Sequence, residues 1–277
     1  MDTQESVRQF YARLVTCMGR QSDPRLVAAF ATVRRERFVG PGPWQIPVAG
    51  GYMSSQTDDP AILYQDINVG LLPALGINNG QPSLHARCLE AVAPQPGETA
   101  VHIGAGTGYY TAILSELVAP GGRVHAYEIN TELAGRAAAN LADRAAVSVH
   151  PTSGLEAVLP SSLDVIYVSA GATDVPALWL DALNVGGRLV LPLTPNEGPG
   201  FMLLVTRTTH TTYAARSLSP AYFIPCVGAR DDQTSRALAT ALRVRPPEDI
   251  RSLCRAGAPD ESAWCVWPDW WLSTATV

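Results

Sequence analysis

The chain has 277 residues, of which 47% are hydrophobic and 16% charged, so it can bury one sizeable core and is unlike sequences that remain disordered. Its formal net charge of -5 and the lack of a long basic run argue against a nucleic-acid partner. The five cysteines are widely spaced and form no zinc pattern, which predicts free thiols and no metal site. With no signal-peptide core and no apolar run of membrane-spanning length, we expect a cytoplasmic protein without membrane contact.

Residues 1–90 are expected to form an N-terminal helical and substrate-loop region. Apolar residues from Thr3 to about Ala31, including Met18, recur at helical spacing with a break at 22–24, which predicts two helices. Ser22 or Asp23 would cap the second helix. The short basic stretch 34–37 reads as a solvated helix end without function. Residues 40–60 are rich in glycine and proline and predict a loop, either a lid or a surface excursion.

Residues 91–230 alternate short β-rich runs with helical stretches, which predicts an α/β fold with a Rossmann-like, doubly wound sheet. The expected strands are 99–103, 123–128, 147–150, 165–169, 188–193 and 201–208, and the expected helices are 109–118, 131–142 and 175–183. The C-terminal extension, 231–277, holds one expected helix, 232–242, and four tryptophans. These tryptophans predict either a terminal strand packed on the core or a stacking surface for substrate.

A glycine loop, Gly104-Ala105-Gly106-Thr107-Gly108, follows the first of these strands and precedes the helix that opens at Tyr109. Glycines allow a ligand to approach the backbone, and free amides at a helix start face its polar groups. The next strand ends in Glu128, twenty residues after Gly108, where a carboxylate can accept both ribose hydroxyl hydrogens.

The spacing of this loop separates two classes of cofactor. A dinucleotide loop, G-x-G-x-x-G, would place its third glycine at position 109, which is Tyr109. Gly108 instead gives G-x-G-x-G, the spacing associated with S-adenosyl-L-methionine. The loop therefore favours a methyl donor over a nicotinamide cofactor.

The chain resembles the protein-L-isoaspartate (D-aspartate) O-methyltransferases over roughly residues 7 to 230. The resemblance is carried by four segments, which are 33–39, 101–109, 163–172 and 183–192. It implies a methyltransferase that binds S-adenosyl-L-methionine and methylates a carboxylate of a protein or peptide. The residues that it places at the cofactor are Gly104, Ala105, Gly106, Gly108, Tyr109, Glu128, Ile129, Ser153, Gly154 and His85.

The most specific part of the resemblance is the segment Gly80–Ala86, which is similar to the family's substrate and cofactor loop. Asn79, Gly80, Gln81 and Pro82 are the residues that it implies for the acceptor. His85 has two readings, a packed histidine or a cofactor contact. Asp66, just upstream, either caps the loop or touches the substrate.

The sequence departs from the family's pattern in three places. Asn78-Asn79-Gly80 stands where the family has Thr-Ile-Ser, so the serine hydroxyl is absent and the Gly80 or Asn79 amide is the replacement. His102 replaces an acidic residue, and Ser153 replaces the aspartate that meets the adenine amino group.

Three functions stay open at this stage. The first is methyl transfer to an isoaspartyl or aspartyl carboxylate, which needs no general base because the acceptor is already ionised. The second is a tailoring methyltransferase for a peptide natural product or small molecule, which the altered loop and the C-terminal extension favour. The third is a non-catalytic relative that retains the fold.

Overall fold

Contacts within the chain group its residues into two units. The computed structural model describes residues 3–17 and 23–277. Unit 1 comprises Met1–Glu98 and Ala105–Thr152, and unit 2 comprises Thr99–Gly104 and Ser153–Val277. The three regions expected from the sequence, 1–90, 91–230 and 231–277, stay a prediction.

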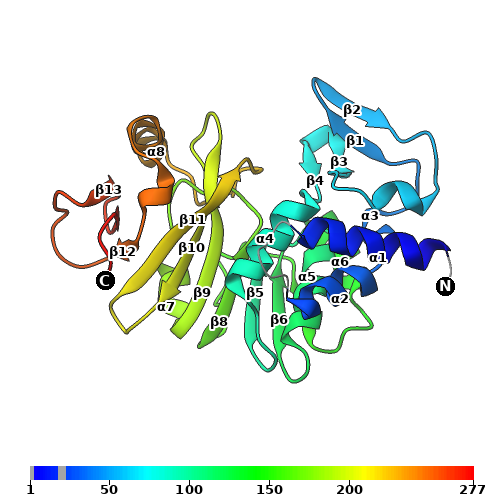
Figure 1. Ribbon diagram of the computed structural model, residues 1–277, viewed down its shortest axis with the longest axis horizontal. Coiled ribbons are helices and arrows are strands. Elements are labelled where there is room, and N and C mark those ends of the chain that lie inside the picture. The colour runs from blue at the N-terminus through cyan, green and yellow to red at the C-terminus, as the bar shows by residue number, and fades with distance from the viewer. Residues whose placement is uncertain (1–2, 18–22) are drawn as a thin grey trace. The chain divides into compact units, whose positions relative to one another are not determined.

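The helices of unit 1 begin with the expected pair, which pack side by side (Figure 1). Asp23 caps the second of them by accepting a hydrogen bond from the Arg25 amide at 2.8 Å, whereas Met18 and Ser22 lie outside the described residues. The six helices described in this unit are α1 (Thr3–Thr16), α2 (Pro24–Thr32), α3 (Glu36–Val39), α4 (Pro82–Val92), α5 (Tyr109–Val118) and α6 (Thr131–Asn140).

The segment 40–60, expected to be a loop throughout, contains an antiparallel hairpin, so that prediction was wrong. Strand β1 (Gln45–Val48) pairs with β2 (Gly51–Ser54), and Gly50 and Gly51 at the turn have φ values of 86° and 155°. Glycine makes such a turn possible, and Pro47 is tolerated because a two-stranded ribbon has only edge strands. The elements that follow are η1 (Pro60–Leu63), β3 (Gly70–Leu72), η2 (Pro73–Leu75) and β4 (Ile77–Asn78).

A small apolar core holds this irregular region against α6. Trp44 at the start of the hairpin packs with Leu63, Val69 and Leu71 from the segment before α4, and with Leu133 on α6. Burial of these side chains gives the region between the hairpin and α4 a fixed place in unit 1.

Unit 1 also contains two parallel strands, β6 (Arg123–Tyr127) and β7 (Val147–His150), paired from Val124 with Val147 to Tyr127 with His150. Helix α5 contacts β6 and α6 contacts β7. The two strands therefore end at one edge, where Glu128 follows β6.

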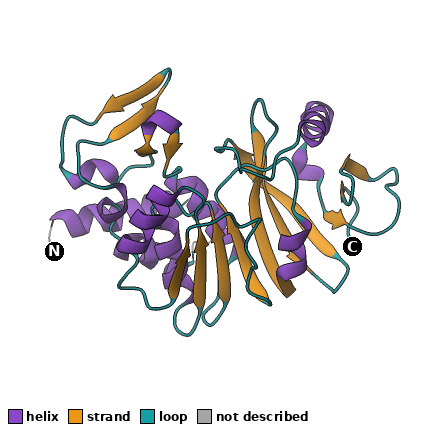
Figure 2. Cartoon of the chain, turned by 180° about the vertical axis from the view of Figure 1, so that it is seen from behind, coloured by secondary structure: helices purple, strands orange, loops and turns teal. Residues whose placement is uncertain are grey.

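Unit 2 is a mixed sheet, shown with its strands and helices in Figure 2. Its strands in spatial order are β13 (Ala263–Val266), β14 (Trp271–Ser273), β12 (Ser252–Cys254), β11 (Tyr213–Ala221), β10 (Gly200–Arg207), β9 (Leu183–Leu193), β8 (Leu163–Val168) and β5 (Thr99–Ile103). Strands β5, β8 and β9 are parallel, and the neighbours from β9 outward are antiparallel. The helical elements are α7 (Ala177–Ala182), α8 (Asp232–Val244) and η3 (Pro247–Asp249). The expected α/β class is confirmed.

The tryptophans of the C-terminal extension are buried, each at most 7% exposed. Trp267 and Trp270 stack with their ring centroids 4.0 Å apart. The indole of Trp267 donates to the Thr173 carbonyl at 2.8 Å, and that of Trp270 to Asp174 Oδ1 at 2.6 Å. Of the two readings made from the sequence, the terminal strand packed on the core fits this arrangement.

All five cysteines are free thiols, as expected, and Cys88, Cys226 and Cys265 are buried. Burial raises the pKa of Cys88 to about 12, which keeps this thiol protonated.

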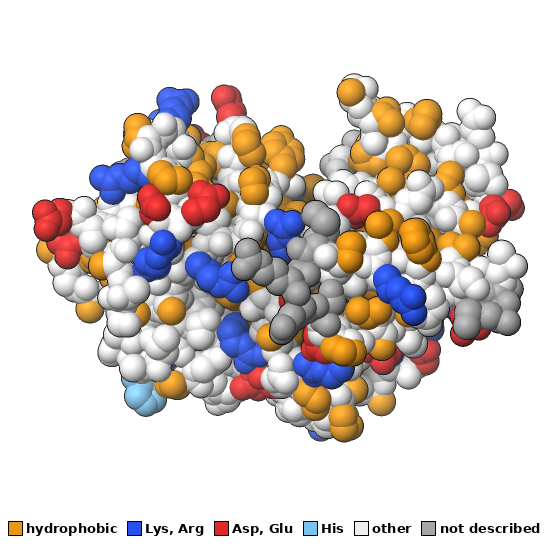
Figure 3. Space-filling view, viewed as in Figure 1, with side chains coloured by type: hydrophobic (Ala, Val, Ile, Leu, Met, Phe, Trp, Pro, Cys, Tyr) orange, Lys and Arg blue, Asp and Glu red, His pale blue; other side chains and the backbone are white. Residues whose placement is uncertain are grey.

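No helix in residues 3–17 or 23–277 is both long and apolar enough to cross a membrane. The face drawn in Figure 3 carries arginine and acidic side chains interspersed with hydrophobic ones.

Trp267→Ala should lower the free energy of unfolding by about 3–5 kcal/mol, because it removes a buried ring, the stacking contact of this ring with Trp270 and its hydrogen bond. Tyr222→Ala is the matched control, since Tyr222 is 79% exposed, and its expected change is within about 0.5 kcal/mol. Urea unfolding measures both. Equal small changes would mean that the extension does not stabilise unit 2.

Candidate cofactor and acceptor site

The glycine loop adopts a backbone that only glycine accommodates without strain. Gly104, Gly106 and Gly108 have φ values of 74°, 57° and 95°. At Gly108 space is also lacking, since an added Cβ would lie 2.7 Å from Leu141 Cδ1. The loop thus turns sharply between β5 and α5, as the sequence predicts.

Glu128 is tied to this loop through backbone amides. Its Oε2 accepts a hydrogen bond from the Gly106 amide at 2.8 Å, and its Oε1 accepts one from the Asn130 amide at 2.9 Å. A carboxylate has about four lone-pair sites, so Glu128 retains capacity to accept a hydrogen bond from a hydroxyl group. The carboxylate therefore fits the ribose of an adenosyl cofactor on its remaining lone pairs.

Burial also sets the ionisation of Glu128, which is 7% exposed. Desolvation raises the pKa of Glu128, and hydrogen bonds from the Asn130, Gly106 and Ile129 amides oppose that rise. Ile129, the next residue of the predicted cofactor set, is 49% exposed.

The two histidines of β6 and β7 bond to each other, in line with the structural reading made from the sequence. His125 Nδ1 lies 3.2 Å from His150 Nε2, and the His150 ring stacks on Tyr127. Burial, followed by the charge of His150, lowers the pKa of His125.

The segment before α4 is organised by Asp66, which caps that helix. Asp66 Oδ1 accepts from the Ser83 amide at 2.8 Å, and Oδ2 accepts from Ser83 Oγ at 2.6 Å and Gln81 Nε2 at 2.8 Å. Gln81, at the N-cap position, makes no capping bond of its own. Of the two interpretations of Asp66, a capping residue or a substrate contact, these hydrogen bonds fit the capping residue.

The departure from the family's pattern at Asn78-Asn79-Gly80 has a well-defined geometry. Asn78 Oδ1 accepts from the Gly80 amide at 2.9 Å, and Asn79 Oδ1 accepts from the Val69 amide at 2.8 Å. The hydroxyl of Tyr110, on the first turn of α5, donates to the Gly80 carbonyl at 3.1 Å. The predicted acceptor segment and the helix after the glycine loop are thus hydrogen-bonded within unit 1.

His85 explains why position 80 carries no side chain. Its imidazole is 3% exposed and stacks on Tyr110, with ring centroids 3.6 Å apart. A Cβ added to Gly80 would lie 2.3 Å from His85 Nε2. The packed reading of His85 is the one that these contacts fit, and its role at the cofactor stays a prediction.

In unit 2, the predicted site residues Ser153 and Gly154 lie in the segment before β8. Ser153 is 8% exposed, and its Oγ accepts from the Leu155 amide at 3.2 Å. The Gly154 carbonyl accepts from Trp179 Nε1 at 3.1 Å, and an added Cβ on Gly154 would lie 2.9 Å from Ile103 Cγ1. Both residues thus sit in a tightly packed turn.

His102 cannot replace the negative charge of the acidic residue expected there. Its side chain is buried and its Nε2 lies 2.9 Å from Ser169 Oγ. Burial lowers the pKa of His102 to about 3, so the imidazole is neutral at physiological pH.

The pattern of the basic stretch 34–37 predicts a solvated helix end, so it does not reveal Arg35 as a buried residue. Arg34 and Arg37 are exposed, but Arg35 is fully buried, at 0% exposure. The prediction is therefore wrong for Arg35, whose guanidinium donates to backbone carbonyls of the segment 63–67. Its apolar neighbours Val33 and Phe38 were the available signal for a buried segment.

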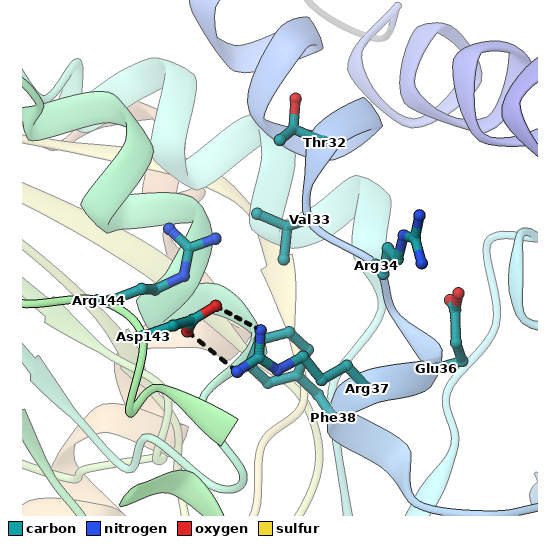
Figure 4. A pocket seen from close by; sticks show the side chains of 8 residues that line it. All are labelled: Thr32, Val33, Arg34, Glu36, Arg37, Phe38, Asp143 and Arg144. Carbon is teal, nitrogen blue, oxygen red and sulfur yellow. Dashed lines mark hydrogen bonds and ion pairs between the residues drawn. The ribbon is translucent and has the colours of Figure 1, made fainter. Parts of the chain in front are cut away.

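A surface pocket lies beside this stretch, between α3 and the connection after α6 (Figure 4). Two of the three arginines that line it form ion pairs with carboxylates. Arg37 forms a bidentate pair with Asp143 at 2.7 and 3.0 Å, and Arg144 pairs with Glu116 at 2.7 Å. No predicted cofactor or acceptor residue lines this pocket.

Solved structures define the class of the fold. The chain superposes on a protein-L-isoaspartate O-methyltransferase with a TM-score of 0.68 and 22% identity, over 86% of this chain and 70% of the other. It also superposes on a Plasmodium falciparum protein of that description, in complex with S-adenosyl-L-homocysteine, with a TM-score of 0.62 and 17% identity, over 79% and 97%. The fold is that of an S-adenosylmethionine-dependent methyltransferase.

Sequence relatives specify the family. Residues 16–231 match the family model described as Protein-L-isoaspartate(D-aspartate) O-methyltransferase. A protein-L-isoaspartate O-methyltransferase of Rhodopseudomonas palustris is 32% identical over 75% of this chain and 87% of its own length. One from Aeropyrum pernix is 36% identical over 56% of this chain and 62% of its own. The chain belongs to the protein-L-isoaspartate (D-aspartate) O-methyltransferase family, which confirms the resemblance seen in the sequence.

Gly80→Ala should lower the free energy of unfolding by about 1–3 kcal/mol beyond the backbone strain, because the new Cβ meets His85. Gly76→Ala measures the strain alone, since Gly76 has a φ of 68° and open space around it. Adding His85→Ala to Gly80→Ala should recover part of the difference in a urea-unfolding cycle. Equal losses for the two alanine variants would contradict the contact.

Glu128→Gln should weaken binding of S-adenosyl-L-homocysteine about tenfold or more, because it removes a charged acceptor and sets an amide against backbone N–H groups. Calorimetry measures the affinity, with the exposed Glu132→Gln as control. In the unmodified protein affinity should fall as pH drops through the raised pKa of Glu128, at higher pH than for an ordinary glutamate. Unchanged binding by Glu128→Gln would remove this residue from the cofactor site.

Proposed function

We propose that the chain transfers a methyl group from S-adenosyl-L-methionine to the free carboxylate of an isoaspartyl or aspartyl residue in a protein or peptide. The observation that carries the proposal is the connection between the two predicted parts of the site. Tyr110, beside the glycine loop, donates a hydrogen bond to Gly80 in the acceptor segment. This contact supports a site in which the cofactor and the acceptor are held by one framework.

The reaction does not require the protein to act as a general base. The cofactor supplies a methyl group on a sulfonium, so a C–O bond to the acceptor forms as the C–S bond breaks, giving a methyl ester and S-adenosyl-L-homocysteine. A carboxylate is ionised at neutral pH and needs no base to become a nucleophile. The residues of this chain have to align the acceptor and exclude water.

We further propose roles for the predicted site residues. Glu128 accepts hydrogen bonds from the ribose hydroxyls of the cofactor, and Asn79, Gly80, Gln81 and Pro82 border the acceptor. The remaining predicted cofactor residues, which line the adenosyl and methionine parts, are Gly104, Ala105, Gly106, Gly108, Tyr109, Ile129, Ser153, Gly154 and His85. The free thiols support the further proposal that the protein acts in the cytoplasm.

Incubation of the purified protein with methyl-labelled S-adenosyl-L-methionine and an isoaspartyl peptide tests the proposal. We expect label that base releases as volatile methanol, and a parallel reaction with the matched aspartyl peptide measures whether an aspartyl carboxylate is also methylated. Cofactor binding without volatile methanol from the isoaspartyl peptide would exclude this acceptor.

A second candidate is methylation of a peptide natural product or small molecule on the same scaffold. It is favoured by the segment 232–277, which lies outside the family match and adds three strands beyond β11. Methyl transfer to such an acceptor, with none to isoaspartyl peptides, would replace the first proposal. A protein that binds the cofactor but transfers to neither acceptor would be a non-catalytic relative.

A further inference from the structure

Arg35 is a fully buried cation whose guanidinium faces the segment before α4. It donates to the carbonyls of Leu63, Gln65 and Ile67, the second of these at 3.0 Å. Its Nη2 also lies 3.5 Å from the side-chain oxygen of Asn79. One side chain from the start of α3 therefore holds both ends of the segment 63–79.

This charge has no anionic partner among residues 3–17 and 23–277. No carboxylate of that part of the chain lies within ion-pairing distance of Arg35. Two carboxylates close by in sequence or space are engaged elsewhere, Glu36 by the Tyr64 hydroxyl and Asp66 by Ser83 and Gln81. Buried charges are normally paired, because carbonyl groups compensate a lost hydration shell only in part.

Asn79 has the opposite deficiency, a donor without an acceptor. Its Oδ1 is used by the Val69 amide and faces Arg35, which fixes the orientation of the carboxamide. Its Nδ2 is buried and has no hydrogen-bond partner. The amide dipole thus has its negative end toward the guanidinium and its positive end directed away from it.

We propose that Arg35 and Asn79 together recognise the negative charge of the acceptor, with Nδ2 of Asn79 donating to a peptide carboxylate and Arg35 supplying the positive potential behind it. Nδ2 is closed to solvent here, so the carboxylate reaches it with a shift of the segment 78–82. The inference rests on the proposed function and assigns the residues that recognise its acceptor carboxylate. Asn79 binds the acceptor, and Arg35 is a positioning residue that acts through it.

The competing role for Arg35 is a purely structural one, as a clamp on the segment 63–79. Asn79→Asp distinguishes the two roles. The aspartate keeps an oxygen for the Val69 amide and gives Arg35 an ion-pair partner, so a clamp would be maintained or strengthened. It also replaces the free donor by an anion, which would repel an acceptor carboxylate.

We expect Asn79→Asp to raise the KM for an isoaspartyl peptide about tenfold to a hundredfold, the loss of one charge-assisted hydrogen bond, without loss of thermal stability or cofactor affinity. Gln65→Glu is the matched control, since it adds the same charge to the same segment on an exposed side chain. Its KM should stay within about twofold of the unmodified protein. A KM for Asn79→Asp equal to that of the control would overturn the inference.

A second measurement uses the unmodified protein and does not depend on the folding of a variant. Calorimetry on the complex with S-adenosyl-L-homocysteine compares an isoaspartyl peptide with the peptide whose isoaspartyl carboxylate is a carboxamide. We expect the acid to bind at least about tenfold more tightly than the amide. Equal affinity would overturn the inference.

The two proposals fail differently. Methyl transfer to the isoaspartyl peptide without discrimination between acid and amide would overturn the role of Arg35 and Asn79 alone. Discrimination in binding without methyl transfer would overturn the proposed function alone.

Discussion

The buried guanidinium of Arg35 is the constraint on which the acceptor side of unit 1 depends. The segment 63–79 contains only short strands and 3-10 turns, so few of its backbone groups are satisfied by regular structure. The guanidinium of Arg35 donates hydrogen bonds to three backbone carbonyls of this segment. Leu63, in the same segment, also packs with Trp44 in a small apolar core. A neutral side chain of this size offers too few donors for that task, which gives a physical reason for a charge in this core.

The predicted cofactor site depends mainly on backbone amides and on the glycine loop rather than on a buried charge. The Gly106 and Asn130 amides donate hydrogen bonds to the Glu128 carboxylate. Gly104, Gly106 and Gly108 have positive φ values and no side chains, so a cofactor can approach the backbone of the loop closely. The two sides meet at α5, whose first turn follows the glycine loop and whose Tyr110 bonds to Gly80 and stacks on His85. A change at position 80 is therefore coupled to the start of this helix.

Periodicity predicted the regular elements well because they bury alternating or helical faces of their own sequence. Strands 99–103 and 147–150 and helix 109–118 were predicted with their observed limits. The hairpin at 45–54 was missed because its prolines and glycines are equally typical of loops. Position 80 could not be explained from the sequence, since the ring that excludes a side chain there comes from the next helix and is held by Tyr110, thirty residues away. Such contacts between distant segments leave no local pattern.

Arg35 illustrates the same limit for the candidate site. A basic residue in a basic stretch is typically solvent-exposed, whereas the side chain of Arg35 is buried and donates to carbonyls of the distant segment 63–67. Local motifs thus predict the candidate cofactor residues, whereas the arrangement of the candidate acceptor segment depends on tertiary contacts. It is in this acceptor segment that Asn78-Asn79-Gly80 departs from the family's pattern.

A crystal structure of the protein with S-adenosyl-L-homocysteine and an isoaspartyl peptide tests the roles of Glu128 and Asn79 most directly. We expect the ribose hydroxyls to contact Glu128 and the peptide carboxylate to lie within about 3 Å of Asn79 Nδ2. A carboxylate bound away from Asn79, or a ribose that does not contact Glu128, would contradict these roles.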